Sequence, residues 1–164
     1  MAEYKAIVVV VSTKGSQGER EDQVGPALGR RLVEAGYAVG STIIVTDDQA
    51  VIAETLVEMV DERGLDLILT SGGTGLSPTD LTPEATEGVV DRLIPGLAEA
   101  MRAAGRAITP HADLSRALVG QRRQSLIINL PGSPKGALEN LEVVLPALGH
   151  ALDKIKGDTR DCAR

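Results

Sequence analysis

The chain contains no phenylalanine and no tryptophan, and tyrosine occurs only twice. A hydrophobic core must therefore be built from valine, leucine, isoleucine and alanine. Such an aliphatic core favours helices packed on a parallel sheet over a β fold rich in aromatic residues. The 164 residues fall within the usual range of one domain.

Cysteine and long apolar runs are equally scarce. The single cysteine, Cys162, lies in a polar segment, which excludes an internal disulfide and argues against thiol chemistry. The longest apolar runs, 6–11 and 126–128, have the length of strands and are too short to span a membrane. The first residues, MAEYK, lack the apolar region of a secretory signal. We therefore expect a cytoplasmic protein without a membrane partner.

Basic residues are outnumbered, with 17 lysines and arginines against 23 acidic residues and a net charge of −6. Proteins that bind nucleic acid hold the phosphate backbone with clustered lysines and arginines. The charge balance therefore argues against nucleic acid as a partner.

Short apolar segments alternate with segments of helical periodicity. The pattern predicts strands at 5–12, 38–46 and 65–70, with helices from Val24 to Ala35 and from about Gln49 to Gly64. Three such strand and helix steps imply parallel strands joined by right-handed crossovers. We expect an α/β fold with a mostly parallel sheet, in one domain that spans 1–164.

The second half of the chain adds three helices and a hairpin. The pattern predicts a helix capped by Thr82, a helix from about Gly96 to Gly105, a hairpin within 117–130, and a helix from Ser133 with Leu138, Leu141, Leu145 and Leu148 inward. Pro146 should kink or split the last helix. The tail from about Gly157 is predicted to be flexible.

Every unusual polar loop follows a predicted strand. These loops are STKGSQG from Ser12, TDDQ from Thr46, TSGGTGLSPTD from Thr70 and NLPGSPKG from Asn129. In open α/β sheets ligands bind beyond the carboxyl ends of the strands. We therefore expect the four loops to converge on one binding crevice.

The glycine loop has the composition of an anion site. Gly72, Gly73 and Gly75 can adopt positive φ and bring backbone N–H groups close to a phosphate, while Thr70, Ser71 and Thr74 add hydroxyls. The loop is not a Walker A motif, and a purely structural turn is the alternative.

Lys135 adds a second indication of an anion. It falls in the first turn of a helix, where a cation is unfavourable unless an anion binds between it and the helix N-terminus. A solvated surface lysine is the alternative interpretation of Lys135.

Acidic residues follow two of the strands. Either Asp47 or Asp48 can cap the helix that starts near Gln49, but both cannot. Asp80 lies inside the phosphate loop, where its carboxylate would repel an anionic ligand. A divalent cation would turn this repulsion into attraction, and Mg²⁺ commonly uses one or two carboxylates together with substrate phosphates. Asp47 and Asp80 are therefore the predicted metal ligands and catalytic residues.

These segments together resemble a known family. SGGTGLSPTDLTPEAT, residues 71–86, is similar to the signature loop of the molybdenum cofactor biosynthesis domain, above all in its single-domain molybdopterin adenylyltransferases. Ser12 with the turn at 16–18, the TDDQ loop, LSR at 114–116 and NLPGSPKG match family landmarks in the same order. The resemblance covers about residues 5–155.

The resemblance implies a three-layer αβα sandwich that forms a homotrimer, with a contact to the molybdate-inserting enzyme as a further expectation. It implies an enzyme, a nucleotidyltransferase that binds molybdopterin and MgATP, transfers AMP to the terminal phosphate of molybdopterin and releases pyrophosphate. Asp47 and Asp80 match the acidic positions that hold Mg²⁺. The substrate-binding residues implied are Ser12, Gly72, Gly73, Thr74, Gly75, Ser115, Arg116, Asn129, Pro131, Gly132, Ser133 and Lys135.

One departure and two alternatives stay open. Residues 12–14 read Ser-Thr-Lys where several relatives have Ser-Asp-Arg, so a lysine replaces a guanidinium fork and the roles of Thr13 and Lys14 are undefined. A noncatalytic molybdopterin carrier would keep the phosphate loop without needing the aspartates. A molybdate-inserting or other nucleotide-processing enzyme on the same domain is the second alternative.

Overall fold

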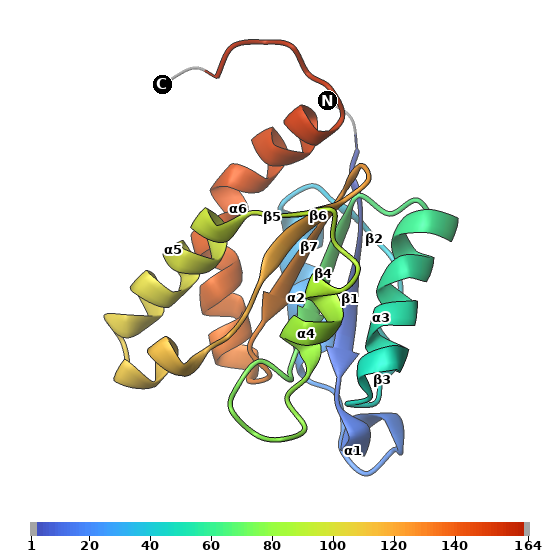
Figure 1. Cartoon of the computed structure of the whole chain (residues 1–164), viewed down its shortest axis with the longest axis vertical. Coiled ribbons are helices and arrows are strands. Elements are labelled where there is room, and N and C mark those ends of the chain that lie inside the picture. Colours follow the sequence, from blue (N-terminus) through green and yellow to red (C-terminus); the bar gives the residue numbers. More distant parts are fainter. Residues whose placement is uncertain (1–2, 163–164) are drawn as a thin grey trace.

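The computed structural model describes residues 3–162, in which a central sheet lies between two layers of helices (Figure 1). The strands run in the spatial order β2-β1-β4-β7-β6-β5, and β3 also pairs with β1. Neighbouring strands among β1, β2, β3, β4 and β7 are parallel, whereas β5 and β6 add an antiparallel edge. The strands are β1 (Lys5–Val11), β2 (Ala38–Val39), β3 (Ile43–Val45), β4 (Leu67–Ser71), β5 (Arg92–Leu93), β6 (Val119–Arg122) and β7 (Ser125–Leu130).

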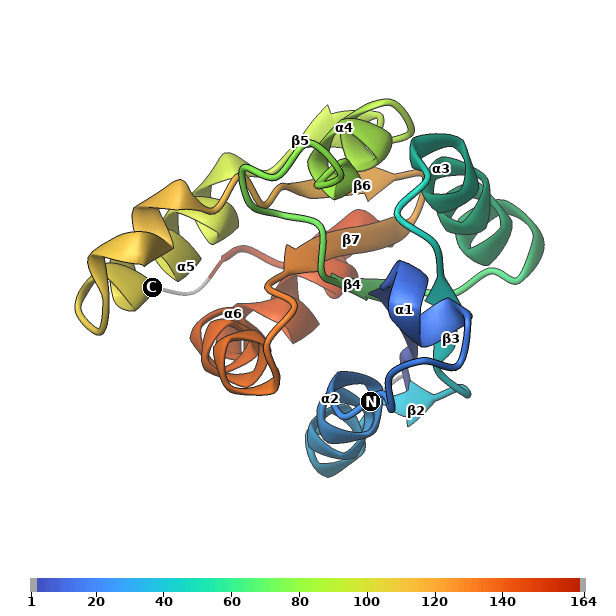
Figure 2. The ribbon, with the colours of Figure 1, turned by 90° about the horizontal axis from the view of Figure 1, so that it is seen from below.

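Helices cover both faces of the sheet (Figure 2). The helices are α1 (Thr13–Ser16), α2 (Val24–Glu34), α3 (Gln49–Val57), α4 (Thr82–Glu87), α5 (Pro95–Arg106) and α6 (Pro134–Ile155), with a π-helical turn η1 (Glu58–Glu62) and a 3₁₀ turn η2 (Pro110–Leu114). Helices α2, α5 and α6 contribute to one apolar cluster, and α3 with α4 contribute to the other. The predicted three-layer αβα sandwich is confirmed.

The side chains of β1 show why both layers are needed. Ala6, Val8 and Val10 belong to the cluster under α2 and α6, while Ile7 and Val9 belong to the cluster under α3. Because successive side chains of a strand point to opposite faces, an unbroken apolar strand requires helices on both sides.

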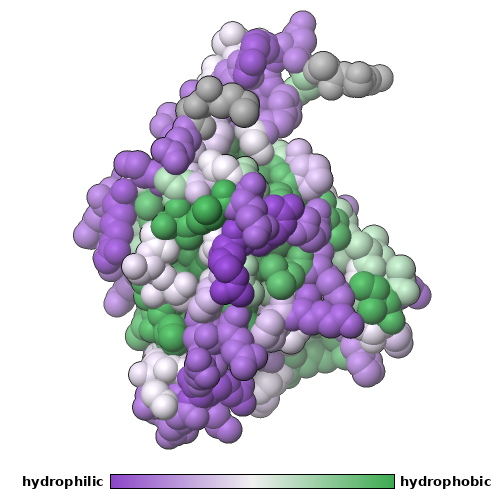
Figure 3. Space-filling model, turned by 180° about the vertical axis from the view of Figure 1, so that it is seen from behind, coloured by the Kyte–Doolittle hydropathy of each residue, from purple (hydrophilic) through white to green (hydrophobic). Residues whose placement is uncertain are grey.

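The outer surface is mixed in character. On the face seen in Figure 3, hydrophilic side chains are interspersed with smaller apolar areas. The large apolar side chains that are exposed within 3–162 come from different elements and loops: Val33, Val51, Leu76, Leu93, Ile108 and Leu114. Single exposed apolar side chains are normal on a protein surface, and of this set Ile108 and Leu114 line a common cavity.

The predicted strand at 38–46 is divided into β2 and β3. Along β1 the register advances three residues, from Ala6 to Val9, while the partner segment advances four, from Val39 to Ile43. The extra residue interrupts the ladder as a bulge does, so one continuous strand cannot form. Strand β4 also begins two residues later than predicted.

Two predictions about the helices need correction, and one helix was not predicted. Pro146 does not split α6, which continues to Ile155 because Val144 and Leu148, buried on either side, anchor it to the core. Thr82 does not cap α4: it lies within the helix and its hydroxyl bonds elsewhere. The helix α1 after β1 was not predicted.

The hairpin and the chain end complete the fold. Strands β6 and β7 form the predicted hairpin, with a two-residue loop in which Arg123 has a φ of 48°. After α6, Arg160 forms ion pairs with Asp153 and Asp158. The predicted flexibility of the tail stays a prediction, and residues 163–164 lie outside the described residues. Within 3–162 no helix is long and apolar enough to cross a membrane.

Candidate active site at the carboxyl ends of the parallel strands

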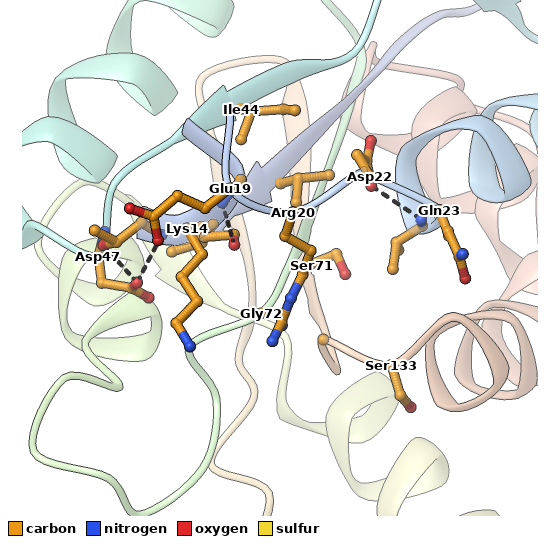
Figure 4. Close-up of a pocket in the computed structure, with 18 of the residues that line it drawn as sticks. Lys14, Glu19, Arg20, Asp22, Gln23, Ile44, Asp47, Ser71, Gly72 and Ser133 are labelled. Carbon is orange, nitrogen blue, oxygen red and sulfur yellow. Dashed lines mark hydrogen bonds between the residues drawn. The ribbon is translucent and has the colours of Figure 1, made fainter. Parts of the chain in front are cut away.

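A cavity of about 1110 Å³ lies where β1, β3, β4 and β7 end (Figure 4). All four predicted loops contribute to its walls, so their expected convergence is confirmed. The sheet explains this meeting, because parallel strands deliver their following loops to the same edge. The predicted site residues that line the cavity are Ser12, Asp47, Gly72, Gly73, Asp80, Gly132 and Ser133.

Two of the three loop glycines have the predicted positive φ. Gly72 has a φ of 105° and Gly73 a φ of 68°. A Cβ on Gly72 would lie 2.4 Å from the carbonyl oxygen of Val11, and one on Gly73 would lie 2.3 Å from Thr82 Oγ1. Gly75 is not in the left-handed region, which corrects the prediction. A Cβ there would lie 2.9 Å from Asp80 Oδ2, so Gly75 provides room for that carboxylate.

Fewer backbone N–H groups of the glycine loop are available to a phosphate than predicted. The N–H of Gly72 donates to the carbonyl of Leu130 at 3.0 Å, so it is not available to a ligand. The N–H groups of Gly73, Thr74 and Gly75 have no acceptor within residues 3–162. Three successive free N–H groups in a glycine turn form a site suited to an anion.

Thr82 fixes the base of this cradle. Its buried hydroxyl donates to the carbonyl of Gly72 at 2.9 Å, and its N–H donates to the carbonyl of Gly73 at 3.1 Å. Ser71 Oγ donates to the carbonyl of Pro131 at 2.8 Å, which links the glycine loop to the loop after β7. The hydroxyls of Thr82 and Ser71 therefore hold the backbone in place.

Asn129 is fully buried and lines neither this cavity nor its neighbour. Its Nδ2 donates to Thr70 Oγ1 at 3.0 Å and to Thr86 Oγ1 at 2.9 Å, while its Oδ1 accepts from the N–H of Leu118 at 3.0 Å. The side chain of Asn129, predicted to contact the substrate, instead links β4, α4 and the residue before β6 through these hydrogen bonds. Thr70 is likewise occupied within the protein.

Asp47 is held by the residue that departs from the family pattern. Its Oδ2 accepts from the N–H of Thr13 at 3.0 Å and from Thr13 Oγ1 at 2.8 Å, and its own N–H donates to that hydroxyl at 3.1 Å. Asp48 caps α3 by accepting from the N–H of Val51 at 3.0 Å. The choice between the two aspartates is thereby settled: Asp48 is the cap and Asp47 faces the cavity.

Asp80 reaches the same cavity from the glycine loop. Its Oδ2 accepts from the N–H of Ser77 at 2.9 Å, and its N–H donates to the carbonyl of Ser77 at 2.9 Å. In the described chain, Oδ1 of both Asp47 and Asp80 has no hydrogen-bond partner. Each carboxylate thus uses one oxygen to hold its loop and presents the other to a ligand. No group of three or more His, Cys, Asp or Glu side chains suited to a metal occurs in residues 3–162.

Arg116 binds backbone carbonyl groups of the glycine loop and lines neither cavity. Its N–H donates to the carbonyl of Thr74 at 2.9 Å, Nε to the carbonyl of Gly75 at 2.8 Å, and Nη2 to the carbonyl of Asp80 at 2.7 Å. Nη1 pairs with Glu84, and this hydrogen bond holds the pKa of Glu84 below its ordinary value. The predicted substrate contact of Arg116 is therefore a clamp on the loop.

A second cavity of about 340 Å³ lies across the glycine loop. It is lined by apolar residues of α5 and η2, such as Met101 and Leu114, together with polar groups such as Asn140. The predicted site residues that line it are Thr74, Gly75, Ser115, Pro131 and Ser133. Ser133 lines both cavities, and its Oγ caps α6 by accepting from the N–H of Gly136 at 3.1 Å.

Lys135 lines neither cavity. Its side chain is 84% exposed, and Nζ lies 3.9 Å from Glu139 Oε1. Lys135 therefore lies in the first turn of α6, as predicted, with its side chain in solvent, and its contact with an anion stays a prediction.

Two cations that line the first cavity were not predicted as site residues. Lys14 on α1 had no defined role, and the loop that carries Arg20 contains no motif that would single it out. Both side chains extend into the cavity (Figure 4). Asp22 Oδ1 accepts from the N–H groups of Val24 and Gly25 in the first turn of α2, which ties the end of this loop to the helix.

Comparison with known proteins bears on this site. Residues 7–150 match the family model described as probable molybdopterin binding domain. The chain is 42% identical over 155 residues to the molybdopterin adenylyltransferase of Helicobacter pylori, covering 92% of this chain and 87% of that protein. It is 42% identical over 147 residues to that of Escherichia coli K12, covering 88% and 75%.

Solved structures agree with these relatives. The molybdopterin biosynthesis enzyme MoaB from Thermus thermophilus superposes with a TM-score of 0.86 at 50% identity, covering 94% of this chain and 97% of that one. The Mog protein from Mycobacterium ulcerans gives a TM-score of 0.87 at 42% identity, covering 93% and 99%. The chain therefore belongs to the molybdopterin-binding family of molybdenum cofactor biosynthesis proteins, the family that its sequence motifs resemble.

Proposed function

We propose that this protein transfers AMP from MgATP to the terminal phosphate of molybdopterin and releases pyrophosphate. The observation that carries the proposal is the meeting of Asp47, Asp80 and the glycine loop at one cavity, with one carboxylate oxygen of each aspartate unpaired in the described chain. The names of the relatives, molybdopterin adenylyltransferase at about 42% identity, support the same reaction.

The residues present fit a magnesium ion. Mg²⁺ prefers oxygen ligands and usually takes one or two carboxylates, completing its shell with water and substrate phosphates. Asp47 and Asp80 offer this set, since Thr13 and Ser77 already fix the second oxygen of each. When bound there, Mg²⁺ would neutralise the phosphates and stabilise the leaving pyrophosphate.

The chain itself would orient the two substrates. The free N–H groups of Gly73, Thr74 and Gly75 would hold the terminal phosphate of molybdopterin, whose second pKa of about 6 leaves it ionised near neutral pH. One of its oxygens attacks the α-phosphorus, the bond from that phosphorus to the bridging oxygen breaks, and pyrophosphate leaves with the electron pair. No protein nucleophile is required, so positioning and charge stabilisation suffice.

The two cavities suggest where each substrate binds. We assign the nucleotide to the first cavity, which holds both aspartates, and the pterin ring to the second, which has Met101, Leu114 and the polar Asn140. The acceptor phosphate would then lie at the glycine loop between them. The homotrimer, the contact with a molybdate-inserting enzyme and the cytoplasmic location stay predictions.

The test is pyrophosphate release with MgATP and molybdopterin. We expect release by the wild type and a loss of about 100-fold or more in Asp47→Asn and in Asp80→Asn, with molybdopterin binding retained in both. Asp48→Asn is the matched control: Asp48 neighbours Asp47 but caps α3, and asparagine also caps well, so release should persist.

Other outcomes would reassign the protein. Tight molybdopterin binding without release, indifferent to ATP and to the loss of Asp47, would identify a noncatalytic carrier. A product that forms only when molybdate is supplied would identify a molybdate-inserting activity instead.

A further inference from the structure

The loop between α1 and α2 places Arg20 at the wall of the first cavity. At its start, the N–H of Glu19 donates to the carbonyl of Lys14 at 2.9 Å, and Gly18 turns the chain with a φ of 74°. At its end, Asp22 Oδ1 accepts from the N–H groups of Val24 and Gly25 at 2.9 and 3.0 Å. Both ends of the loop are thus held by hydrogen bonds, and Arg20 lies between them.

Lys14 and Arg20 line the same cavity as the glycine loop. Figure 4 shows the guanidinium of Arg20 and the ammonium of Lys14 extending into the same cavity, which Gly72 and Ser133 also line. Glu19 and Glu21 are close in sequence, yet within 3–162 neither Arg20 nor Lys14 forms an ion pair. Two cations without carboxylate partners in one cavity are available to an anionic ligand.

The charge balance of the cavity shows why such cations matter. Its walls carry five carboxylates, from Glu19, Glu21, Asp22, Asp47 and Asp80, but only the two cations Lys14 and Arg20. Asp22 Oδ1 accepts from two N–H groups at the start of α2, and Asp47 with Asp80 are the proposed magnesium ligands. A triphosphate entering this acidic cavity needs further positive charge beyond a single metal ion. Arginine suits that need, because its planar fork can bind two phosphate oxygens at once.

We propose that Arg20, with Lys14 beside it, binds the β- and γ-phosphates of the nucleotide and then the pyrophosphate product. This assignment rests on the proposed function, since it names the nucleotide subsite of the same cavity. When the bond between the α-phosphorus and the bridging oxygen breaks, the electron pair stays on the pyrophosphate. Arg20 is placed to stabilise the negative charge that develops there.

The test compares ATP and pyrophosphate, which can make the proposed contact, with AMP, which lacks the β- and γ-phosphates. Calorimetry with Mg²⁺ at low ionic strength would give dissociation constants for ATP, pyrophosphate and AMP, with pyrophosphate release measured in parallel. Arg20→Ala should weaken ATP and pyrophosphate binding about tenfold or more and leave AMP binding unchanged. Arg20→Lys should be intermediate, because the charge is kept and the fork is lost.

Arg30→Ala is the matched control. Arg30 is exposed on α2 and lines neither cavity, so it changes the net charge equally without touching the site. Its dissociation constants should equal those of the wild type. Circular dichroism and the melting temperature would show that each variant is folded.

The outcomes separate this inference from the proposed function. ATP and pyrophosphate binding unchanged in Arg20→Ala would overturn the phosphate subsite while leaving adenylyl transfer intact. An equal loss of AMP affinity would also overturn it, because the contact would then involve the shared part of the nucleotides. Wild-type protein that binds ATP but releases no pyrophosphate would overturn the proposed function, while a selective Arg20 effect would still support the subsite.

Discussion

Gly73 combines a left-handed backbone with a contact that leaves no space for a side chain. Its φ is 68°, and an added Cβ would lie 2.3 Å from Thr82 Oγ1, whose buried hydroxyl holds the carbonyl of Gly72. Gly73→Ala should therefore lower the free energy of unfolding by about 2–3 kcal/mol, from the left-handed strain and the disturbed hydrogen bond. Urea unfolding measures this loss, and pyrophosphate release should fall with it.

Gly149→Ala is the control for that substitution. Gly149 lies inside α6, and nothing lies within 4 Å of an added Cβ. Alanine should stabilise this helix by about 0.5–1 kcal/mol. A Gly73→Ala variant that unfolds like the wild type would contradict the account of the cradle.

Single residues show where sequence reasoning reached its limit. Asp47 and Asp80 were found because each follows a strand, and the structure brings both to one cavity. Arg116 and Asn129 belong to the same motifs, but their side chains turn away from the cavity and bind backbone carbonyls and hydroxyls. A motif shows that a residue is needed at a position, whereas the direction of its side chain depends on packing.

Secondary structure elements were predictable where their own residues decide them. The hairpin of β6 and β7 follows from two strand patterns around a short polar turn. The division of the strand at 38–46 depends instead on one extra residue relative to β1, and the sequence of one strand does not reveal its register with another.

The clamp of Arg116 joins the glycine loop to α4, and its strength should depend on pH. Arg116 holds the pKa of Glu84 below its ordinary value, so the folded state favours the ionised carboxylate. The contribution of the pair is complete above the pKa of unfolded glutamate, about 4.3, and is lost as the pH falls through the folded pKa. The melting temperatures of wild type and Glu84→Gln should therefore differ near pH 6 and converge as the pH falls through the lowered folded pKa of Glu84.

A double-mutant cycle identifies the partner. In an Arg116→Met background, Glu84→Gln should no longer change the melting temperature in a way that depends on pH. If the same dependence persists without Arg116, the shift would come from another source such as the N-terminal turn of α4.

The architecture of the whole molecule follows from its apolar pattern. Unbroken apolar strands require helices on both faces, and parallel strands deliver their loops to one edge, so the sandwich and the convergence of loops were predictable. The division of the predicted site residues into two cavities was not. It depends on the path of the glycine loop, which Thr82 and Arg116 fix through contacts between segments far apart in the chain.

Tyr4 joins the start of the described chain to the last turns of α6. Its hydroxyl donates to Asp153 near the end of α6, and Lys156 Nζ lies 5.9 Å from the centre of its ring. The same lysine pairs with Asp66 Oδ1 at 2.6 Å, and Asp66 Oδ2 accepts from the N–H of Lys5 at 2.8 Å. Burial and then the bond to Asp153 raise the pKa of Tyr4 to about 12.

The raised pKa of Tyr4 allows its contact with α6 to be measured by titration. Because the folded state favours the neutral phenol, the contribution of Tyr4 is complete below pH about 10, the ordinary tyrosine value, and is lost as the pH rises toward 12. Tyr37→Phe leaves Tyr4 as the only tyrosine, and the chain has no tryptophan, so ultraviolet absorbance reports Tyr4 alone. The midpoint should lie near 12 in the folded protein and near 10 in urea. A midpoint near 10 in both would mean that the hydroxyl of Tyr4 is not held by Asp153 of α6, which would leave the ion pair of Lys156 and Asp66 as the polar link between α6 and the start of β4.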